Sequence, residues 1–285
     1  MRLFGKERAE PEAPAPVLDL SGPHLRLAIE SLTRDSDAAG GVEAYVGALA
    51  LKTSLFSEVF ANGDMARLGE SDFFDVCVFI TAVRRRIGSW LGANDFSLMR
   101  GALEGLLDGW QDPGTVDERL MRFTARFPAD KKHRWVRDLA AEILHFMAPE
   151  TCPLMTRWMW DSGTNSGVVR EIWFGLESPG ARIEVDDDHA TFAALYADLE
   201  EFVRDNGIFR DVPLFVDLLC AHIYAAYIND RGGAYLRADF SAPLDPMLHT
   251  RRILGLDGID SESGRTRLKL IDGSAYTVAE PRLLN

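Results

Sequence analysis

Cysteine is scarce in this chain, and its three cysteines lie far apart. Cys77, Cys152 and Cys220 form no CxxC pair, and none has a histidine at zinc-finger spacing. The spacing argues against a disulfide framework and against an iron–sulfur cluster or structural zinc ion held by this chain alone. We therefore expect neither a metal nor a cofactor.

Lysine is scarce as well, so the positive charge is carried almost entirely by arginine. The chain has 31 basic and 44 acidic residues, a net charge of −13 and a pI near 4.9. A strongly acidic protein repels phosphate backbones and anionic lipid headgroups, so a nucleic-acid partner is not expected. Arginine is suited to bidentate pairing with carboxylates, within the fold or across an interface.

Long apolar runs are also missing. No uncharged apolar segment reaches the roughly 18 residues that suggest a membrane-spanning helix. Residues 1–18 mix charges with three prolines, which predicts a disordered N-terminal lead rather than a secretory signal. The expected location is the cytoplasm, with no membrane span, and 47% hydrophobic residues are enough for a globular core.

Apolar residues recur at helical spacing from residue 19 to residue 260. This pattern predicts a mainly α protein, a bundle of about nine to eleven helices. Residues 212–228 are apolar almost all round and predict the central buried helix. Residues 168–174 fit a strand as well as a helix. The predicted helices span residues 19–35, 42–60, 71–91, 95–107, 115–127, 130–147, 150–161, 188–203, 212–228 and 246–254.

The periodicity changes near the C-terminus. Apolar and basic residues alternate from Arg265, followed by Asp272-Gly273 and a second short run. Asp-Gly between alternating runs predicts a β-hairpin. Residues 261–285 are therefore expected to form a C-terminal β-hairpin appendage that packs on the helical domain or on a partner.

Tryptophan, arginine and turn residues are most concentrated in residues 152–174. Trp158 lies at helical spacing from Met155 and beside Met159, so most of these aromatics are expected in the core. The turn 161–167 is flanked by Arg157 and Arg170. We expect this turn to be a pocket mouth or a partner contact.

An ExxH motif, Glu142 to His145, has the spacing used in di-iron helical bundles. No second ExxH accompanies it, and on a helical wheel His145 lies well off the apolar stripe of its helix. We therefore assign His145 a capping or surface role and predict no di-iron site.

Several polar residues at buried positions are candidates for binding a ligand or partner. Arg84 lies on an apolar helical stripe and either pairs with a carboxylate or binds an anionic ligand. Asp217 aligns with Tyr224 on the apolar helix, whereas His222 lies on another side, and we expect Asp217 to pair with an arginine such as Arg84 or Arg157. Arginines after this helix either surround an anion or clamp the loop. They are Arg231, Arg237, Arg251 and Arg252.

Two parts of the sequence resemble the helical accessory protein of the bacterial sulfur-oxidising, heterodisulfide-reductase-like complex. They are CPLMTRWMWDSGTNSGVVREIWF, and DNGIFRDVPLFVDLLCAHIYAAYINDRGGAYLRADFS with PMLHTRRILGLDG. The resemblance covers about a quarter of the chain and implies a cytoplasmic accessory to an iron–sulfur flavin enzyme. It assigns no site residues.

These observations support two main functional hypotheses. The first is a non-catalytic accessory, assembly or interaction subunit of a cytoplasmic enzyme, because no catalytic constellation is recognisable. The alternative is a small-molecule enzyme or binding protein with an anion-binding pocket at the centre of the helical domain, where His222 would serve as acid or base. A metal-dependent enzyme is a third. The residues predicted to line the central pocket are Trp158, Trp160, Asp217, His222 and Tyr224, with Arg84, Arg157 or Arg170 fixing the anion.

Overall fold

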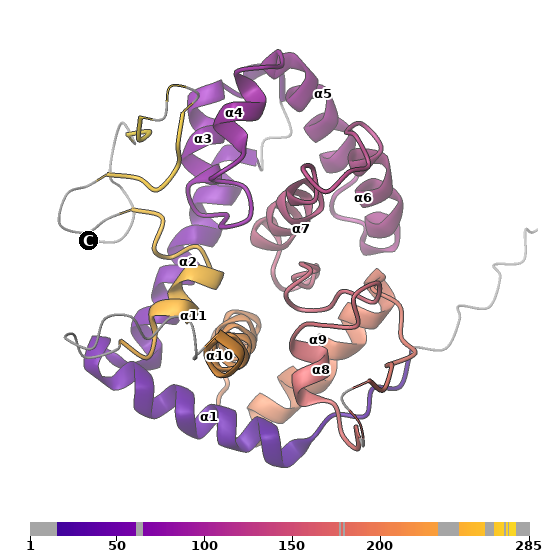
Figure 1. Cartoon of the computed structure of the whole chain (residues 1–285), viewed down its shortest axis with the longest axis vertical. Helices are drawn as coiled ribbons and strands as arrows, with labels where there is room; N and C mark the ends of the chain where they lie inside the picture. The colour runs from indigo at the N-terminus through magenta and orange to yellow at the C-terminus, as the bar shows by residue number, and fades with distance from the viewer. Residues whose placement is uncertain are drawn as a thin grey trace, which may run out of the picture.

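The computed structural model describes residues 16–60, 65–176, 178, 180–232, 245–259, 265–270, 272 and 274–277. This part of the chain is helical and without strands, which confirms the predicted all-α bundle (Figure 1). Most of the predicted disordered lead lies outside it. The helices are α1 Gly22–Ser36, α2 Gly41–Phe60, α3 Glu70–Cys77, α4 Ile87–Leu91, α5 Phe96–Leu107, α6 Val116–Thr124, α7 Trp135–Met147, α8 Val168–Ile172, α9 His189–Asp205, α10 Val212–Gly232 and α11 Leu248–Ile253.

Side-chain caps fix the start of three helices. Ser21 accepts a hydrogen bond from the backbone N–H of His24 at the start of α1. Asp95 and Asp188 do the same for α5 and α9. Each cap satisfies a backbone donor that the first helical turn leaves without a partner.

The central helix is α10, seen almost end-on in Figure 1 with the other helices around it. It contacts α1, α2, α8, α9 and α11, and residues 212–222 are all buried, which confirms the prediction for this segment. By length and composition Val212–Asp230 is apolar enough to cross a membrane, yet 72% of that window is buried inside the protein. A core helix passes the same test, so α10 is weak evidence for a membrane span.

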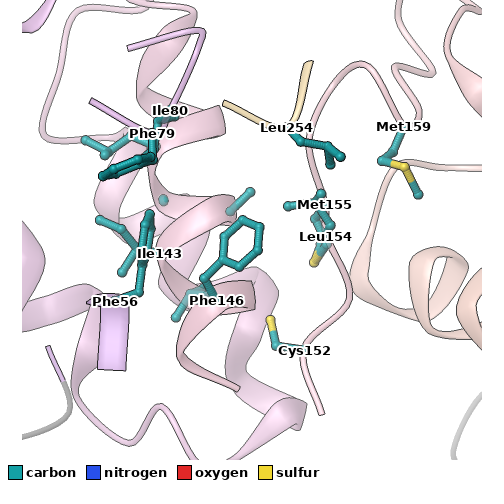
Figure 2. Close-up of a cluster of buried hydrophobic side chains, with 14 of the residues drawn as sticks. Phe56, Phe79, Ile80, Ile143, Phe146, Cys152, Leu154, Met155, Met159 and Leu254 are labelled. Atoms are coloured by element: carbon teal, nitrogen blue, oxygen red, sulfur yellow. The ribbon is translucent and has the colours of Figure 1, made fainter. Parts of the chain in front are cut away.

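The same hydrophobic core continues between α2 and α7. Figure 2 shows Phe56 of α2 beside Ile143 and Phe146 of α7, and the rings of Phe56 and Phe146 are 5.2 Å apart. Every residue of α7 except Arg137 is buried, including Asp138 and Glu142. This helix is therefore an interior element rather than an amphipathic surface helix.

The predicted helix over 71–91 is wrong in its middle. α3 ends at Cys77, residues 78–86 form successive turns, and α4 begins at Ile87. The break lies where the turn after α11 packs on this backbone: a Cβ placed on Gly255 would be 1.8 Å from the carbonyl oxygen of Phe79. Gly255 also has a φ of 75°, which favours glycine.

The predicted helix over 150–161 is also wrong. Residues 153–156 have no regular secondary structure, and turns follow at 157–159. The ring of Pro153 has no N–H to give to a helix, and the carbonyl of Cys152 is bound by His145 Nδ1 at 2.8 Å. Contacts with core residues therefore replace the backbone hydrogen bonds of a helix here. The choice between strand and helix over 168–174 is settled as the short helix α8.

The predicted C-terminal hairpin is present only as an isolated antiparallel bridge between Lys269 and Ala275. Two backbone hydrogen bonds accompany it, from Leu270 to Ser274 and from Tyr276 to Leu268. Of the predicted appendage, residues 261–264, 271, 273 and 278–285 lie outside the described residues. The segment packs on α3, where the ring of Tyr276 lies 5.1 Å from that of Phe74 and its hydroxyl 2.7 Å from Asp75.

Candidate anion-binding groove

Asp257, in the turn after α11, is surrounded by three arginines. Its carboxylate lies 2.8 Å from Arg84 Nη1 and 3.5 Å from the Nε atoms of both Arg252 and Arg267. Arg84 and Asp257 are buried, whereas the side chains of Arg252 and Arg267 are 38% and 45% exposed. One carboxylate therefore faces three guanidinium groups, and the excess positive charge is exposed to solvent through Arg252 and Arg267.

The close approach of two backbone segments assembles this cluster. A Cβ placed on Gly88 of α4 would lie 2.0 Å from the carbonyl oxygen of Lys269, so only glycine fits there. The backbone N–H of Lys269 donates to the carbonyl of Arg84, and that of Arg267 donates to Gly258. These contacts place the C-terminal basic residues beside Arg84.

A groove of about 780 Å³ opens beside the cluster. In Figure 1 the C-terminal segment that forms one wall runs next to α3. Five of the lining residues are basic and none of those in the described part of the chain is acidic, on a protein whose net charge is −13. The lining residues are Arg84, Arg85, Arg265, Thr266, Arg267, Lys269, Ala275 and Thr277.

The arginines keep Asp257 ionised. Burial alone would raise the pKa of this carboxyl group, but Arg84, Arg267 and Arg252 outweigh it and hold the pKa below its ordinary value. The cluster therefore keeps a net positive charge at neutral pH. Guanidinium groups match carboxylate and phosphate oxygens in geometry, which makes this groove a candidate anion-binding site.

The groove is equipped for binding rather than for acid–base chemistry. Among its described lining residues, arginine, lysine and threonine are the polar types, and none is a histidine, cysteine or carboxylate. Thr266 already donates its hydroxyl to the carbonyl of Tyr276. No residue in that part of the lining has the ordinary chemistry of a general base or an activated nucleophile near neutral pH.

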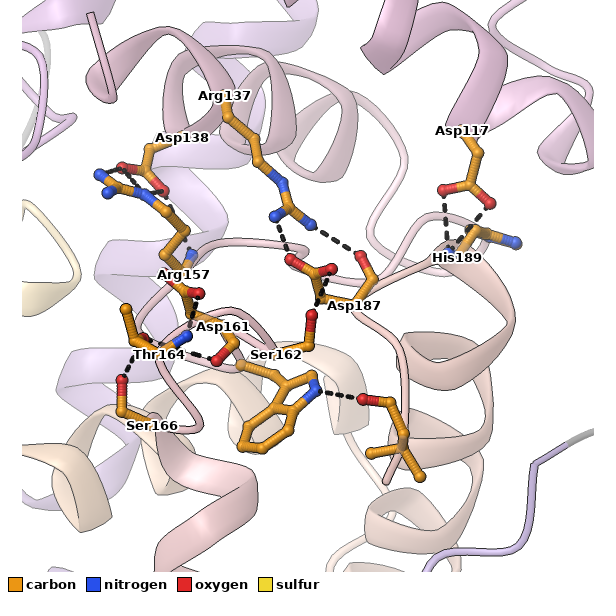
Figure 3. A network of polar contacts seen from close by, with 12 residues as sticks. Asp117, Arg137, Asp138, Arg157, Asp161, Ser162, Thr164, Ser166, Asp187 and His189 are labelled. Atoms are coloured by element: carbon orange, nitrogen blue, oxygen red, sulfur yellow. Dashed lines mark hydrogen bonds and ion pairs between the residues drawn. The ribbon is translucent and has the colours of Figure 1, made fainter. Parts of the chain in front are cut away.

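The structure brings Arg84 to the groove but places Arg157 and Arg170 elsewhere. Arg84 pairs with a carboxylate, one of its two predicted roles. Arg157 binds Asp138 of α7 with Nη2 at 2.6 Å and Nε at 3.2 Å, as Figure 3 shows. Arg170 donates to the carbonyl of Ala181 at 2.8 Å. These two arginines thus have partners within the fold.

The turn 161–167 is tied to the loop that precedes α9. Ser162 and Arg137 both bind Asp187 (Figure 3), and the amide of Asn165 binds Ala181 and Ile183. Arg157 and Asp161 line a surface groove of about 850 Å³ with residues from α6 and α7. The expectation that this turn borders a pocket has geometric support, whereas a partner contact there stays a prediction.

The tryptophans on the candidate list differ in burial. Trp160 is fully buried and donates its Nε1–H to the carbonyl of Val185 at 3.2 Å. Trp158 is half-buried, with its ring 6.0 Å from that of Tyr224. Tyr224 in turn stacks on Tyr227 at 5.7 Å. Trp160 is thus part of the core, while Trp158 and Tyr224 form an aromatic cluster nearer the surface.

The surface or capping role predicted for His145 is wrong. His145 is fully buried, with Nε2 2.8 Å from Asp217 Oδ2 and Nδ1 bound to Cys152. Asp217 also accepts a hydrogen bond from Tyr196, so the expected partners Arg84 and Arg157 are replaced by a histidine and a tyrosine. Burial raises the pKa of Tyr196 well above its ordinary value, so its hydroxyl stays protonated and donates.

His222 lies at another junction, between α1, α10 and α11. Its Nε2 is 3.0 Å from Ser31 Oγ and 3.6 Å from Asp35, and its Nδ1 is 3.3 Å from Thr250 Oγ1. Burial lowers the pKa of His222. Asp217, His222 and Tyr224 therefore contact different partners instead of facing one central pocket.

The remaining candidates add no metal site. Within the described ranges, no group of three or more His, Cys, Asp or Glu side chains is placed to hold a metal ion. The three cysteines are buried and free, and burial raises the pKa of Cys152 to about 12. Arg231 lies in α10, but its side chain and all of Arg237 fall outside the described residues.

Asp257, Arg267 and Lys269 were not among the sequence-based candidates. For Arg267 and Lys269 the signal was the alternation of basic residues in Arg265-Thr-Arg-Leu-Lys269, where exposed and buried side chains alternate in the structure. Comparison with protein families, curated proteins and solved structures finds no match. The function is therefore inferred from the sequence and geometry of this chain.

Proposed function

We propose that this protein is a non-catalytic interaction subunit whose basic groove binds an acidic segment of a partner protein. The observation that carries the proposal is the three-arginine cluster on buried Asp257, continued into a groove whose described lining has basic and no acidic residues. Within the described residues Asp257 is the one carboxylate paired with these three arginines, and an anionic partner would add counter-charge to the cluster.

The shape of the groove favours an extended acidic peptide. Arg265, Arg267 and Lys269 are exposed at every second position, with buried residues between them. Alternate residues of an extended chain are about 6–7 Å apart. A peptide with a carboxylate at every second residue repeats at the same distance, so several ion pairs can form at once.

The charge of the whole protein disfavours nucleic acid as the ligand. A net charge of −13 opposes the approach of a long phosphate backbone, while a short acidic segment needs only the local field of the groove. We place the partner in a cytoplasmic multi-subunit enzyme. The resemblance of the two sequence segments makes the sulfur-oxidising, heterodisulfide-reductase-like complex the first candidate.

The test uses a fluorescent peptide of alternating glutamate and serine, with affinity measured by anisotropy. Arg267→Glu and Lys269→Glu change exposed side chains, and each is expected to weaken binding at least about tenfold, or about 1.4 kcal/mol. Raising the salt concentration should weaken wild-type binding further. Arg204→Glu, at a side chain 48% exposed on α9, is the matched control and should leave binding unchanged.

Three results would contradict the proposal. Equal losses in all three variants would mean that only net charge matters. Inorganic phosphate displacing the peptide at a similar concentration would assign the groove to a small anion. Tighter binding of single-stranded DNA than of the peptide would assign it to nucleic acid.

A further inference from the structure

A second groove, of about 710 Å³, lies where the end of α1, the start of α2 and the α9–α10 connection meet. Its character is opposite to that of the basic groove, because apolar side chains and glycines form much of its lining. The apolar lining residues are Val42, Val46, Ile208, Phe209 and Phe215.

Phe209 projects from the connection and is 73% exposed, the most exposed of the aromatic side chains in the described part of the chain. The connection is well defined. Gly207 has a φ of 88°, Asp211 has a φ of 49°, and the backbone N–H of Ile208 donates to Val203 at 3.2 Å. A non-glycine residue in the left-handed region costs energy and is characteristic of functional sites. The ring of Phe209 is therefore exposed to solvent on a turn with a defined backbone conformation.

The floor of the groove is a face of α2 that has been left open. Gly47 lies inside the helix, where glycine lowers stability relative to alanine. A Cβ at this position would meet nothing within 4 Å, so no neighbour requires the glycine. The same face continues to Leu51, which is 41% exposed. The glycine keeps space above the helix free.

The rim of the groove is acidic. Asp37, Glu43 and Asp211 line it, against Arg210 as the basic residue among the described lining. An apolar floor between carboxylates is complementary to a helix with an apolar stripe flanked by lysine or arginine. The apolar stripe would be buried against Phe209 and Val46, and the flanking cations would face the rim.

We propose that this groove binds a basic amphipathic helix of a partner protein. The inference goes beyond the proposed function, because the ligand has the opposite charge and a different secondary structure. It also stands independently of that function, since the two grooves share no lining residue among those described. Together the two grooves would let the protein join two partners of opposite charge.

The experiment uses three synthetic peptides of 18 residues: a leucine and lysine amphipathic helix, the same peptide with glutamate for lysine, and a scrambled version of the first. Their affinities are measured by fluorescence anisotropy. The basic helix should bind wild type at least about tenfold more tightly than either other peptide. Phe209→Ser and Gly47→Gln should each lower its affinity about tenfold.

Gly47→Gln fills the groove without changing charge, and its melting temperature should equal or exceed that of wild type because the glycine leaves the helix. Phe174→Ser, at a phenylalanine 59% exposed elsewhere on the surface, is the matched control for Phe209→Ser and should bind like wild type. Lys269→Glu should also leave this peptide's affinity undiminished, which separates failure here from failure at the basic groove.

Five outcomes would overturn the proposal. The first two are no measurable binding of the basic helix and equal binding of all three peptides. The third is equal binding of the basic helix by wild type, Phe209→Ser and Gly47→Gln. The fourth is a concentration-dependent dimer in wild type that Gly47→Gln abolishes. The fourth would make a second copy of the chain the occupant. A fifth outcome would be an increase in peptide affinity of more than tenfold on deletion of residues 1–15, which would make that segment the occupant instead.

Discussion

Replacing Lys52 with methionine tests how the part of the core between α2 and α7 tolerates charge. Lys52 Nζ donates to Glu142 Oε2 at 2.7 Å and to the carbonyl of Leu254 at 2.9 Å, and it lies 4.0 Å from the ring centre of Phe146. Figure 2 shows how apolar these surroundings are, with Phe56, Ile143 and Phe146 close together. Methionine has nearly the same length and volume as lysine but no charge.

Lys52→Met should lower stability because Glu142 and the carbonyl of Leu254 both lose their partner. Glu142 would remain buried without a counter-charge, which costs about 3–5 kcal/mol. The carbonyl of Leu254 would also lose a donor, at a cost of about 1–3 kcal/mol. The free energy of unfolding of a whole domain is about 5–15 kcal/mol, so Lys52→Met should be marginally stable. Adding Glu142→Leu removes the isolated charge and should recover at least half of the loss, because uncharged pairs of similar volume replace buried ion pairs at little cost.

The pH dependence provides an independent check. Burial raises the pKa of Glu142, and Lys52 opposes that rise. Without Lys52 the folded-state pKa rises further above the unfolded value of about 4.3. The folded state then binds a proton more tightly than the unfolded state does. Relative to wild type, Lys52→Met should therefore gain stability as the pH falls from 7.5 to 5.5 and lose it as the pH rises through the raised pKa.

Urea unfolding followed by circular dichroism at both pH values measures these free energies. A loss below about 1 kcal/mol at pH 7.5 would show that Glu142 finds water or another partner. A double variant as unstable as Lys52→Met would also refute the reasoning. So would a loss that grows on acidification.

Two further substitutions test other contacts. Arg157→Ala should lower the free energy of unfolding by about 1–3 kcal/mol, because Asp138 stays largely buried without its bidentate partner; an unchanged melting temperature together with lost partner binding would instead place Arg157 at an interface. Gly255→Ala should cost about 3 kcal/mol or more in urea unfolding, because its Cβ would overlap the carbonyl of Phe79 at a φ of 75°. Gly47→Ala, in open space, should instead gain about 0.5–1 kcal/mol, and equal effects of the two would contradict the role given to Gly255.

Local signals in the sequence identified most of the helices. Ser21 and Asp188 cap helices where predicted, and the apolar run over α10 marked the central helix. These features depend on neighbouring residues, so a single sequence contains them. The breaks at 78–86 and 150–161 depend on backbone contacts from distant segments, which helical periodicity does not register.

The polar residues of α7 show why the site was harder to predict. Asp138, Glu142 and His145 share one stripe of this helix, and a helical wheel assigns a polar stripe to solvent. Each is instead buried and pairs with a charged side chain, contributed by Arg157, Lys52 and Asp217. The sequence shows this polar stripe. It does not show that Arg157, Lys52 and Asp217 contact the stripe from other elements of the fold.

The basic groove was missed for the same reason. Arg84 was recognisable as a charge on an apolar stripe, but its partner Asp257 lies far along the chain. The predicted hairpin suggested an appendage, whereas its residues form one wall of the groove against α4.

The meeting of Arg84 with Asp257 also sets an order for biosynthesis. Arg84 emerges from the ribosome long before Asp257, Arg267 and Lys269, so its counter-charge and the segment packed beside it are missing until these residues are made. A chain interrupted before Asp257 would lack the carboxylate that pairs with Arg84 and one wall of the groove. Partner binding through the groove would thus distinguish finished molecules from truncated ones.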